Sequence, residues 1–330
     1  MKATVYSISP YERPYFDSEG EISYDLHKES LSEKTVSLAE GSDAVVVFAN
    51  DQVNAGVLSK LNELGITFVA TRSMGIDHID VKKAEELGIR VANVPHYSPH
   101  SVAEHSIALM LALNRRLIQA DNRVKNQDFR LHGLVGFDMH GKTVGLLGAG
   151  EIGEISAKIL AGFGCKVLIY DLEKNDELIE KYQVSYESIK SLCEKSDIIS
   201  IHVPLTDETK HLIDTEKIGW MKKGVMLVNT ARGAICKTED LIDGLKEGKI
   251  GYLGLDVYEH EKGLFFEDHS QDIIQDDLFI RLLGFKNVLI TAHQAFLTGE
   301  AIRENMETTE KNLRDWSQGT KAEKGREKKD

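Results

Sequence analysis

The stretch GKTVGLLGAGEIGEISAKILAGFGCKVLIYD (141–171) constrains the fold of this chain more than any other. It reads as an apolar strand, a glycine-rich turn, an amphipathic helix and a second apolar strand. Gly148, Gly150 and Gly153 stand in the G-x-G-x-x-G spacing. The first glycine permits a tight turn, the second lets the backbone approach a pyrophosphate, and the third lets the helix pack closely on the strand. The stretch therefore predicts a dinucleotide-binding βαβ unit.

Two further features of this unit indicate which dinucleotide it binds. Glu151 and Ile152 open the helix, where unpaired backbone N–H groups would face the phosphates. Asp171 ends the second strand, and a carboxylate there accepts hydrogen bonds from a ribose 2′-hydroxyl but repels a 2′-phosphate. Leu172 and Glu173 follow, so no arginine is at hand for a phosphate. We therefore expect NAD rather than NADP.

Strand-like and helix-like stretches alternate along most of the chain. The predicted strands outside the glycine unit are 3–8, 43–49, 66–71, 90–94, 197–203, 224–230, 252–257 and 287–292, and the clearest early helices are 57–64 and 81–88. This alternation predicts parallel sheets with helices on their faces. A chain of 330 residues is also too long for one ordinary hydrophobic core, so two domains are expected.

The alternation breaks at VPHYSPHSVAEHSIALMLALNRRLIQA (94–120), which carries two of the five prolines and then a long helical run. Ser101 and Glu104 could form a capping box at the start of that helix. A turn of this kind is a good point for the chain to cross between domains.

The predicted fold is therefore α/β, with two Rossmann-like or flavodoxin-like parallel-sheet domains. The cofactor domain, 101–296, is inserted into the substrate (catalytic) domain, which is formed by 1–100 and 297–330. The last segment would supply a return helix and then a charged tail, TKAEKGREKKD, which lacks apolar residues other than alanine and is expected to fray.

Composition limits the partners. The formal net charge of -13 disfavours nucleic acid and anionic membrane surfaces. The chain start does not resemble a secretory leader, and no apolar run reaches membrane-spanning length, so a cytoplasmic protein is expected. Cys165, Cys193 and Cys236 lack zinc or redox spacing and are expected to be reduced packing residues.

The carboxyl ends of the predicted strands mark one rim, where ligands of such sheets bind. Arg232, Asp256 and His293 follow three of these strands, and Glu261 lies shortly after Asp256 in the stretch DVYEHE (256–261). That stretch is open to three interpretations, namely a metal site, a solvated charged turn, or part of a catalytic device.

Several motifs together resemble the D-specific 2-hydroxyacid dehydrogenase family. They are VPHYSPHSVAEH, GAGEIG with its distant Asp171, HVPLT, VNTARG, LDVYEHE and TAHQAF. The resemblance runs from about residue 2 to 317, and 263–283 is similar to the bacterial fermentative D-lactate dehydrogenases in particular.

The resemblance implies that Arg232 binds the substrate carboxylate, that His293 is the acid/base, and that Glu261 is the carboxylate partner of His293. A guanidinium can hold a planar carboxylate bidentately, and an imidazole titrates near neutrality. Glu259 and His260 are then expected to be ordinary loop residues. No metal is expected, because hydride transfer to a keto acid needs none when arginine and histidine supply positive charge.

The resemblance also implies further contacts. The backbone N–H groups of Met74 and Gly75 would bind the substrate carboxylate, and Tyr97 and Phe296 would enclose the small end of the substrate. The positions implied near the nicotinamide and its ribose are Val203, Pro204, Thr230, Ala231 and Asp256. Thr209, also implied as a cofactor contact, stands where many relatives have asparagine.

The leading functional hypothesis is NADH-dependent reduction of pyruvate to D-lactate. One alternative is the same chemistry on a bulkier 2-oxo acid. Another, from a different class, is an NADH-sensing corepressor, because relatives of this fold serve that role. The resemblance, with the broadly apolar run IALMLAL, also implies a homo-oligomer, a dimer or tetramer.

Overall fold

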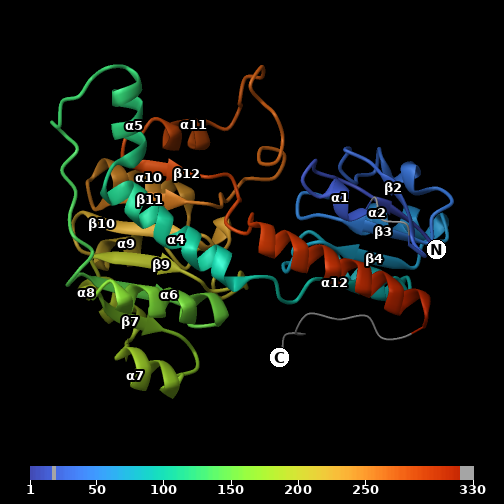
Figure 1. Cartoon of the computed structure of the whole chain (residues 1–330), viewed down its shortest axis with the longest axis horizontal. Helices are drawn as coiled ribbons and strands as arrows, with labels where there is room; N and C mark the ends of the chain where they lie inside the picture. The colour runs from blue at the N-terminus through green and yellow to red at the C-terminus, as the bar shows by residue number, and fades with distance from the viewer. Residues whose placement is uncertain (17–19, 320–330) are drawn as a thin grey trace. The chain divides into compact units, whose positions relative to one another are not determined.

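The computed structural model describes residues 1–16 and 20–319 (Figure 1). The chain divides into two compact units, Met1–Ser98 with the chain from Leu297 onward, and Pro99–Phe296. The second unit is therefore an insertion into the first in the sequence. The charged tail predicted to fray, 320–330, lies outside the described residues.

The first unit is built on a five-stranded parallel sheet in the order β2-β1-β3-β4-β5. Its strands are β1 Lys2–Val5, β2 Ser23–Leu26, β3 Ala44–Val47, β4 Phe68–Thr71 and β5 Arg90–Ala92. Its helices are α1 Arg13–Phe16, the 3₁₀ helix η1 Val36–Ala39, α2 Ala55–Glu63, α3 Val81–Glu86 and α12 Gly299–Ser317. This strand order is the flavodoxin-like one.

The second unit is built on a seven-stranded parallel sheet in the order β12-β11-β10-β9-β6-β7-β8. Its strands are β6 Thr143–Leu147, β7 Lys166–Tyr170, β8 Ser185–Tyr186, β9 Ile198–Ile201, β10 Val225–Asn229, β11 Ile250–Leu255 and β12 Val288–Ile290. Counted from β6, the order is the Rossmann 3-2-1-4-5-6 with one strand added. The direction reverses between β6 and β9, which is where such sheets bind dinucleotides.

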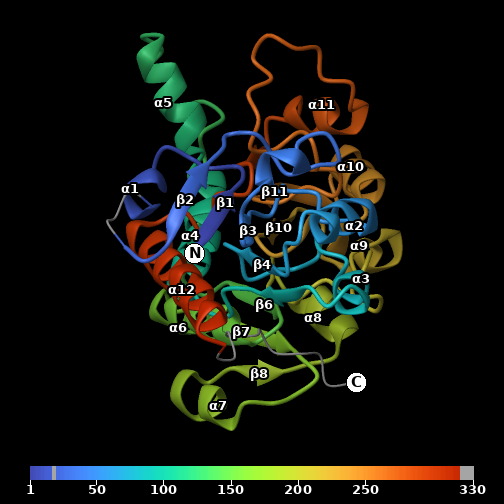
Figure 2. The ribbon, with the colours of Figure 1, turned by 90° about the vertical axis from the view of Figure 1, so that its right-hand side faces the viewer.

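Helices cover both faces of this second sheet (Figure 2). On one face α4 Pro99–Asn114, α6 Glu151–Gly162 and α7 Asp176–Tyr182 bury side chains such as Met110 and Leu160. The other face is covered by α8 Ile189–Lys195, α9 Thr215–Trp220, α10 Thr238–Lys246 and α11 Asp277–Leu283, which bury side chains such as Leu192 and Leu282. A sheet covered on both faces explains the continuous apolar runs of its central strands.

The same two-sided packing holds in the first unit. Leu58 and Leu61 of α2 pack on one face of its sheet, whereas Met306 and Leu313 of α12 pack on the other face with β1 and β4. The predicted fold class, two parallel-sheet α/β domains, is confirmed.

Three local expectations were wrong or incomplete. Helix α4 begins at Pro99, a favoured first residue of a helix, so Ser101 lies inside the helix and is not its N-cap. The long helical run is broken at Arg116, whose φ of 50° is left-handed, and α5 (Leu117–Lys125) starts anew. The edge strands β2 and β8 were not predicted, because only part of each is apolar.

None of the helices in the described part of the chain combines the length and apolar character that a membrane-spanning helix requires.

Candidate active site

The glycine turn follows β6, and its three glycines have different surroundings. Gly148 has φ of 100°, and a Cβ there would lie 2.8 Å from the carbonyl carbon of His202. A Cβ on Gly153 would lie 2.2 Å from the carbonyl oxygen of Gly148. Gly150, in contrast, has open space within 4 Å of its Cβ position. The turn is thus closed on the protein side and open where a phosphate would approach.

Helix α6 begins directly after this open position. Gly150 is its N-cap and has no side chain to accept a hydrogen bond, and Glu151 and Ile152 are the first helical residues. The Asp171 carboxylate reaches back to the turn, since its Oδ2 accepts from the Ala149 N–H at 2.6 Å. This hydrogen bond holds Asp171 beside the turn at the end of β7, where a ribose hydroxyl would need an acceptor.

The residues after β9 and β10 also face this carboxyl edge. The Oγ1 of Thr230 is buried and has no hydrogen-bond partner among the described residues, as expected of a hydroxyl that meets a bound group. Val203 and Pro204 follow β9. The hydroxyl of Thr209 donates to the Pro204 carbonyl at 2.6 Å and accepts from the Thr206 N–H, so it closes this turn. Its predicted cofactor contact stays a prediction.

Arg232 lies in a tight turn after β10. The buried Asn229 holds this turn, because its Oδ1 accepts from the Ala231 N–H at 3.0 Å and its Nδ2 donates to the Arg232 carbonyl at 2.9 Å. The guanidinium itself donates to the Ala231 carbonyl at 2.8 Å and is partly buried. The neighbouring Gly233 presses on the backbone of Tyr258, to whose carbonyl carbon a Cβ would approach within 2.0 Å.

His293 follows β12, two strands from β10, in an unusual conformation. Its φ is 57° and that of Ala292 is 49°, values that few non-glycine residues adopt. The Nδ1 of His293 lies 2.8 Å from the Oε1 of Glu261, whose Oε2 accepts from the Tyr258 N–H at 2.9 Å. The ring of Phe266, a residue that sequence reasoning did not single out, lies 5.7 Å from the imidazole. The imidazole is therefore fixed by one nitrogen, which leaves Nε2 for chemistry.

Asp256 holds the loop that carries His293. Its carboxylate is fully buried and accepts from the Thr291 hydroxyl at 2.6 Å and from the Gln294 and Ala295 N–H groups at 2.9 Å each. Burial raises the pKa of this carboxyl, but hydrogen bonds from His105, Thr291 and the two amides outweigh it and leave the pKa below its ordinary value. Its predicted contact with the cofactor stays a prediction.

Glu259 is not the ordinary loop residue that was expected. Its side chain is only 10% exposed. Its Oε1 lies 2.5 Å from Nε2 of His211, and its Oε2 accepts from the Thr238 N–H at 2.9 Å. The sequence contains one signal for the role of Glu259, which is its charge. A carboxylate that closely follows a buried strand needs hydrogen-bond partners. His260 is exposed, as expected.

The carboxylates of DVYEHE consequently do not converge. Asp256, Glu259 and Glu261 each bind a different segment. Among the described residues no group of three or more histidine, cysteine, aspartate or glutamate side chains is placed to hold a metal ion.

The predicted substrate residues are divided between the two units. In the first unit, the Met74 carbonyl accepts from Asn93 and the Gly75 carbonyl accepts from Ser73, each at 2.7 Å. The N–H groups of Met74 and Gly75 have no acceptor among the described residues. Tyr97 also belongs to this unit, and is partly buried. Arg232 and Phe296, both partly buried, belong to the second unit.

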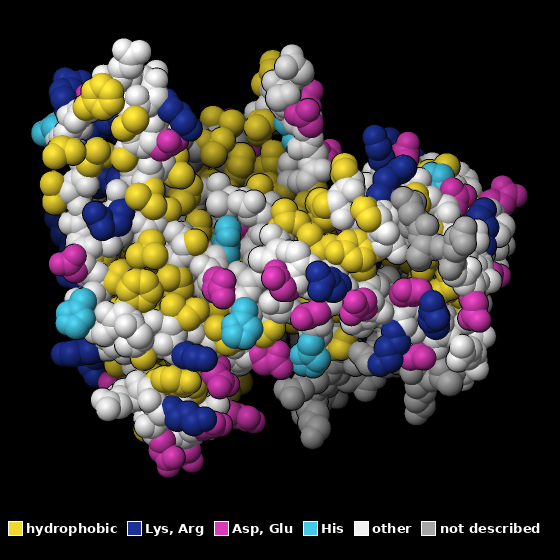
Figure 3. All heavy atoms as spheres, viewed as in Figure 1, with side chains coloured by type: hydrophobic (Ala, Val, Ile, Leu, Met, Phe, Trp, Pro, Cys, Tyr) yellow, Lys and Arg dark blue, Asp and Glu magenta, His cyan; other side chains and the backbone are white. Residues whose placement is uncertain are grey.

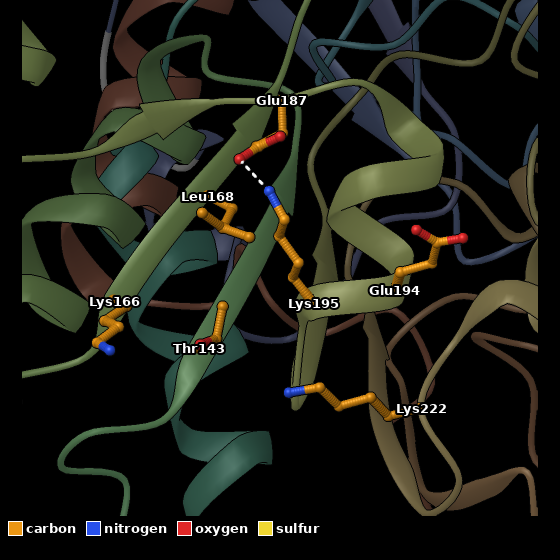
Figure 4. Close-up of a pocket in the computed structure, with 7 residues that line it drawn as sticks. All are labelled: Thr143, Lys166, Leu168, Glu187, Glu194, Lys195 and Lys222. Carbon is orange, nitrogen blue, oxygen red and sulfur yellow. Dashed lines mark hydrogen bonds and ion pairs between the residues drawn. The ribbon is translucent and has the colours of Figure 1, made fainter.

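A separate hollow lies at the opposite, amino edge of the second sheet (Figure 4). It is lined by Thr143 and Lys166, at the starts of β6 and β7, together with Leu168, Glu187, Glu194, Lys195 and Lys222. Lys195 pairs with Glu187 at 2.7 Å and Lys222 with Asp197 at 2.8 Å. This hollow contains none of the predicted site residues.

The chain matches known proteins over nearly its full length. Residues 107–295 match the family model described as D-isomer specific 2-hydroxyacid dehydrogenase, NAD binding domain. A 2-hydroxyacid dehydrogenase homolog of Haemophilus influenzae is 46% identical over 95% of both chains. D-Lactate dehydrogenase of Escherichia coli is 44% identical over 97% of this chain and 98% of that protein.

A solved structure gives the same result for the fold. The structure described as the pyruvate reductase of Chlamydomonas reinhardtii has a TM-score of 0.91 and 40% identity, and each chain covers 98% of the other. The chain therefore belongs to the D-isomer specific 2-hydroxyacid dehydrogenase family and is an NAD-dependent oxidoreductase.

Proposed function

We propose that this enzyme reduces pyruvate to D-lactate, with Arg232 binding the substrate carboxylate and His293 supplying the proton. The observation that carries the proposal is the His293–Glu261 pair at the carboxyl edge of the sheet, on the same edge as the Arg232 turn and the open glycine turn. NADH, when bound, supplies the hydride. The chain must therefore bind a keto acid, orient it, and deliver a proton to its carbonyl oxygen.

Arg232 suits the first task because a guanidinium offers two parallel N–H donors to a carboxylate. Its turn is held by hydrogen bonds from the buried Asn229. The free N–H groups of Met74 and Gly75 are proposed to bind the same carboxylate, and Tyr97 and Phe296 to limit the size of the other end of the substrate.

His293 suits the second task. With Nδ1 held by Glu261, its Nε2 donates a proton to the oxygen that becomes the hydroxyl. The Glu261 carboxylate fixes the plane of the ring. In the reverse direction the neutral imidazole accepts the hydroxyl proton.

The cofactor contacts are assigned from the same edge of the sheet. The N–H groups at the start of α6, with Gly148, Gly150 and Gly153, would hold the pyrophosphate. Asp171 would accept from the adenosine ribose. Around the nicotinamide and its ribose we place Val203, Pro204, Thr209, Thr230, Ala231 and Asp256, of which Thr230 has the unpartnered buried hydroxyl.

The choice of pyruvate is supported by relatives named D-lactate dehydrogenase and pyruvate reductase. A panel of pyruvate, 2-oxobutyrate, 2-oxoisocaproate and phenylpyruvate tests it through kcat/KM with NADH. Pyruvate should rank first. Preference for phenylpyruvate would favour a bulkier substrate, and NADH binding without turnover of any 2-oxo acid would favour the sensor role.

We also propose a homo-oligomer. The segment that follows α5 exposes large apolar side chains, with Phe129 72% exposed, Leu131 80% and Val135 82%. The space-filling view shows hydrophobic side chains gathered over part of the second unit (Figure 3). A monomer rarely leaves such side chains together in water. Light scattering after size exclusion should give at least a dimer mass, and replacing Leu131 and Val135 by aspartate should lower it; a monomeric wild type would contradict this proposal.

A further inference from the structure

The Glu259–His211 pair lies outside the proposed proton relay, yet its carboxylate is largely shielded from solvent. The carboxylate is 10% exposed and the imidazole 35% exposed. Both carboxylate oxygens have partners, Nε2 of His211 at 2.5 Å and the Thr238 N–H at 2.9 Å. A shielded carboxylate needs its hydrogen-bond donors held close to it, because burying an unpaired charge is costly. The segments that carry His211 and Thr238 must therefore lie in a specific arrangement around Glu259.

The segments that it joins enclose the Arg232 turn. Thr238 is the first residue of α10 and ends the segment that starts at Arg232, and α10 has no side-chain N-cap of its own. The Glu259 carboxylate takes that place at the helix start, where a negative charge is favoured.

His211 belongs to a segment that runs beside the same turn. Its own N–H donates to the Ala234 carbonyl at 2.8 Å, and Ile213 pairs with Cys236 in an isolated parallel bridge. The φ of His211 is 53°, which few non-glycine residues adopt, so its backbone needs support from its side chain.

The backbone before Glu259 completes the enclosure. A Cβ on Gly233 would lie 2.4 Å from the Glu259 nitrogen, so the residue after Arg232 rests directly on the DVYEHE backbone. The segment that starts at Arg232 thus contacts Asn229, His211 and the Glu259 backbone.

We infer that Glu259, with His211, is a positioning residue that holds the Arg232 turn in the conformation that binds the substrate carboxylate. The inference rests on the proposed role of Arg232. Each of the three carboxylates of DVYEHE then has a different role. Asp256 holds the loop of His293, Glu261 orients the imidazole, and Glu259 holds the turn of the arginine.

The test is steady-state kinetics of Glu259→Ala, Glu259→Gln and His211→Gln, with NADH affinity measured separately by fluorescence. Glu259→Ala should raise the KM for pyruvate on the order of tenfold, as expected for the loss of buried hydrogen bonds. Its kcat and NADH affinity should change by less than about threefold, because the carboxylate contact acts in both ground and transition states. Glu259→Gln should restore part of the loss, since its amide oxygen can still accept from the Thr238 N–H.

A double-mutant cycle shows whether the effect passes through the arginine. In an Arg232→Lys background, Glu259→Ala should change the KM by less than about twofold, because the contact that it positions is already lost. Glu187→Ala, which breaks a partly buried ion pair with Lys195 at the opposite edge of the sheet, is the matched control and should leave the KM unchanged.

An unchanged KM in Glu259→Ala, or the same increase in both backgrounds, would overturn the inference while leaving the proposed function intact. If Glu259→Ala does not fold, Glu259→Gln and His211→Gln carry the same test. A wild-type enzyme that binds NADH but turns over no 2-oxo acid would overturn the proposed function, and this role with it.

Discussion

His293 and Glu261 are joined by a bond of 2.8 Å between Nδ1 and Oε1, although 32 positions separate them in the chain. The second oxygen of Glu261 accepts from the Tyr258 N–H, so the carboxylate cannot rotate freely. The imidazole is also held through its own backbone, which has φ of 57° and donates from N to the Asp256 carbonyl. Both side chains of the pair are thus fixed in direction.

Glu261→Gln should lower kcat for pyruvate reduction by roughly 10- to 100-fold, less than the full contribution of general acid catalysis, about 10²- to 10⁴-fold, because His293 itself remains. The amide keeps the shape but removes the negative charge beside the imidazole. Steady-state kinetics with pyruvate and NADH measures the change in kcat. Glu259→Gln is the comparison, and should change kcat by less than about threefold, because it leaves the His293–Glu261 contact in place. An unchanged kcat in Glu261→Gln would remove Glu261 from the relay.

Asp256→Asn should loosen the loop of His293. An amide cannot accept from all three donors that the carboxylate satisfies, and a buried unsatisfied donor costs about 1–3 kcal/mol. The melting temperature at neutral pH should fall, and kcat with it. Asp277→Asn, at the exposed start of α11, is the matched control.

The same variant gives a pH dependence with a definite sign. The folded-state pKa of Asp256 lies below its ordinary value, so its contribution to stability is present above the unfolded pKa, near 3.9, and is lost as the pH falls through the folded value. The difference in melting temperature between wild type and Asp256→Asn should therefore be largest above about pH 5 and shrink in acid. A difference that grows in acid would contradict this account.

Asp171→Ala should narrow the preference for NADH over NADPH, because the carboxylate that would repel a 2′-phosphate is removed. Some loss of NADH affinity should accompany it, since the Ala149 N–H of the glycine turn loses its acceptor. The ratio of kcat/KM values for the two cofactors measures this. Asp176→Ala, exposed at the start of α7, serves as control, and an unchanged ratio in Asp171→Ala would assign cofactor choice elsewhere.

Arg232→Lys should raise the KM for pyruvate strongly, with a loss of about 2–4 kcal/mol in substrate binding from the broken bidentate contact. Lysine keeps the charge, so the experiment separates geometry from electrostatics. NADH affinity should stay near the wild-type value. A near-normal KM would mean that Arg232 does not hold the carboxylate.

The sequence was sufficient to predict the positions of residues that lie within one local structural unit. The glycine spacing and the run VLIYD place Gly150 and Asp171 on one edge, because a βαβ unit leaves few ways to arrange them. The roles proposed for Arg232, Glu261 and His293 rest on family resemblance. Spacing alone could not show that two residues 32 positions apart in the chain form one hydrogen bond.

The partners of buried charges were harder to predict. Glu259 reads as one more acid in a charged stretch, and only the fold reveals that His211 and Thr238 converge on it. The helix break at Arg116 was missed for a similar reason. A left-handed arginine leaves no signature in a run of good helix formers.

Chiral analysis of the product is the most direct test of the central claim. The enzyme is incubated with pyruvate and NADH until the absorbance of NADH stops falling, and the lactate is resolved on a chiral column. We predict D-lactate alone, in an amount equal to the NADH consumed. L-Lactate, a racemic mixture, or no consumption of NADH with pyruvate would contradict the account.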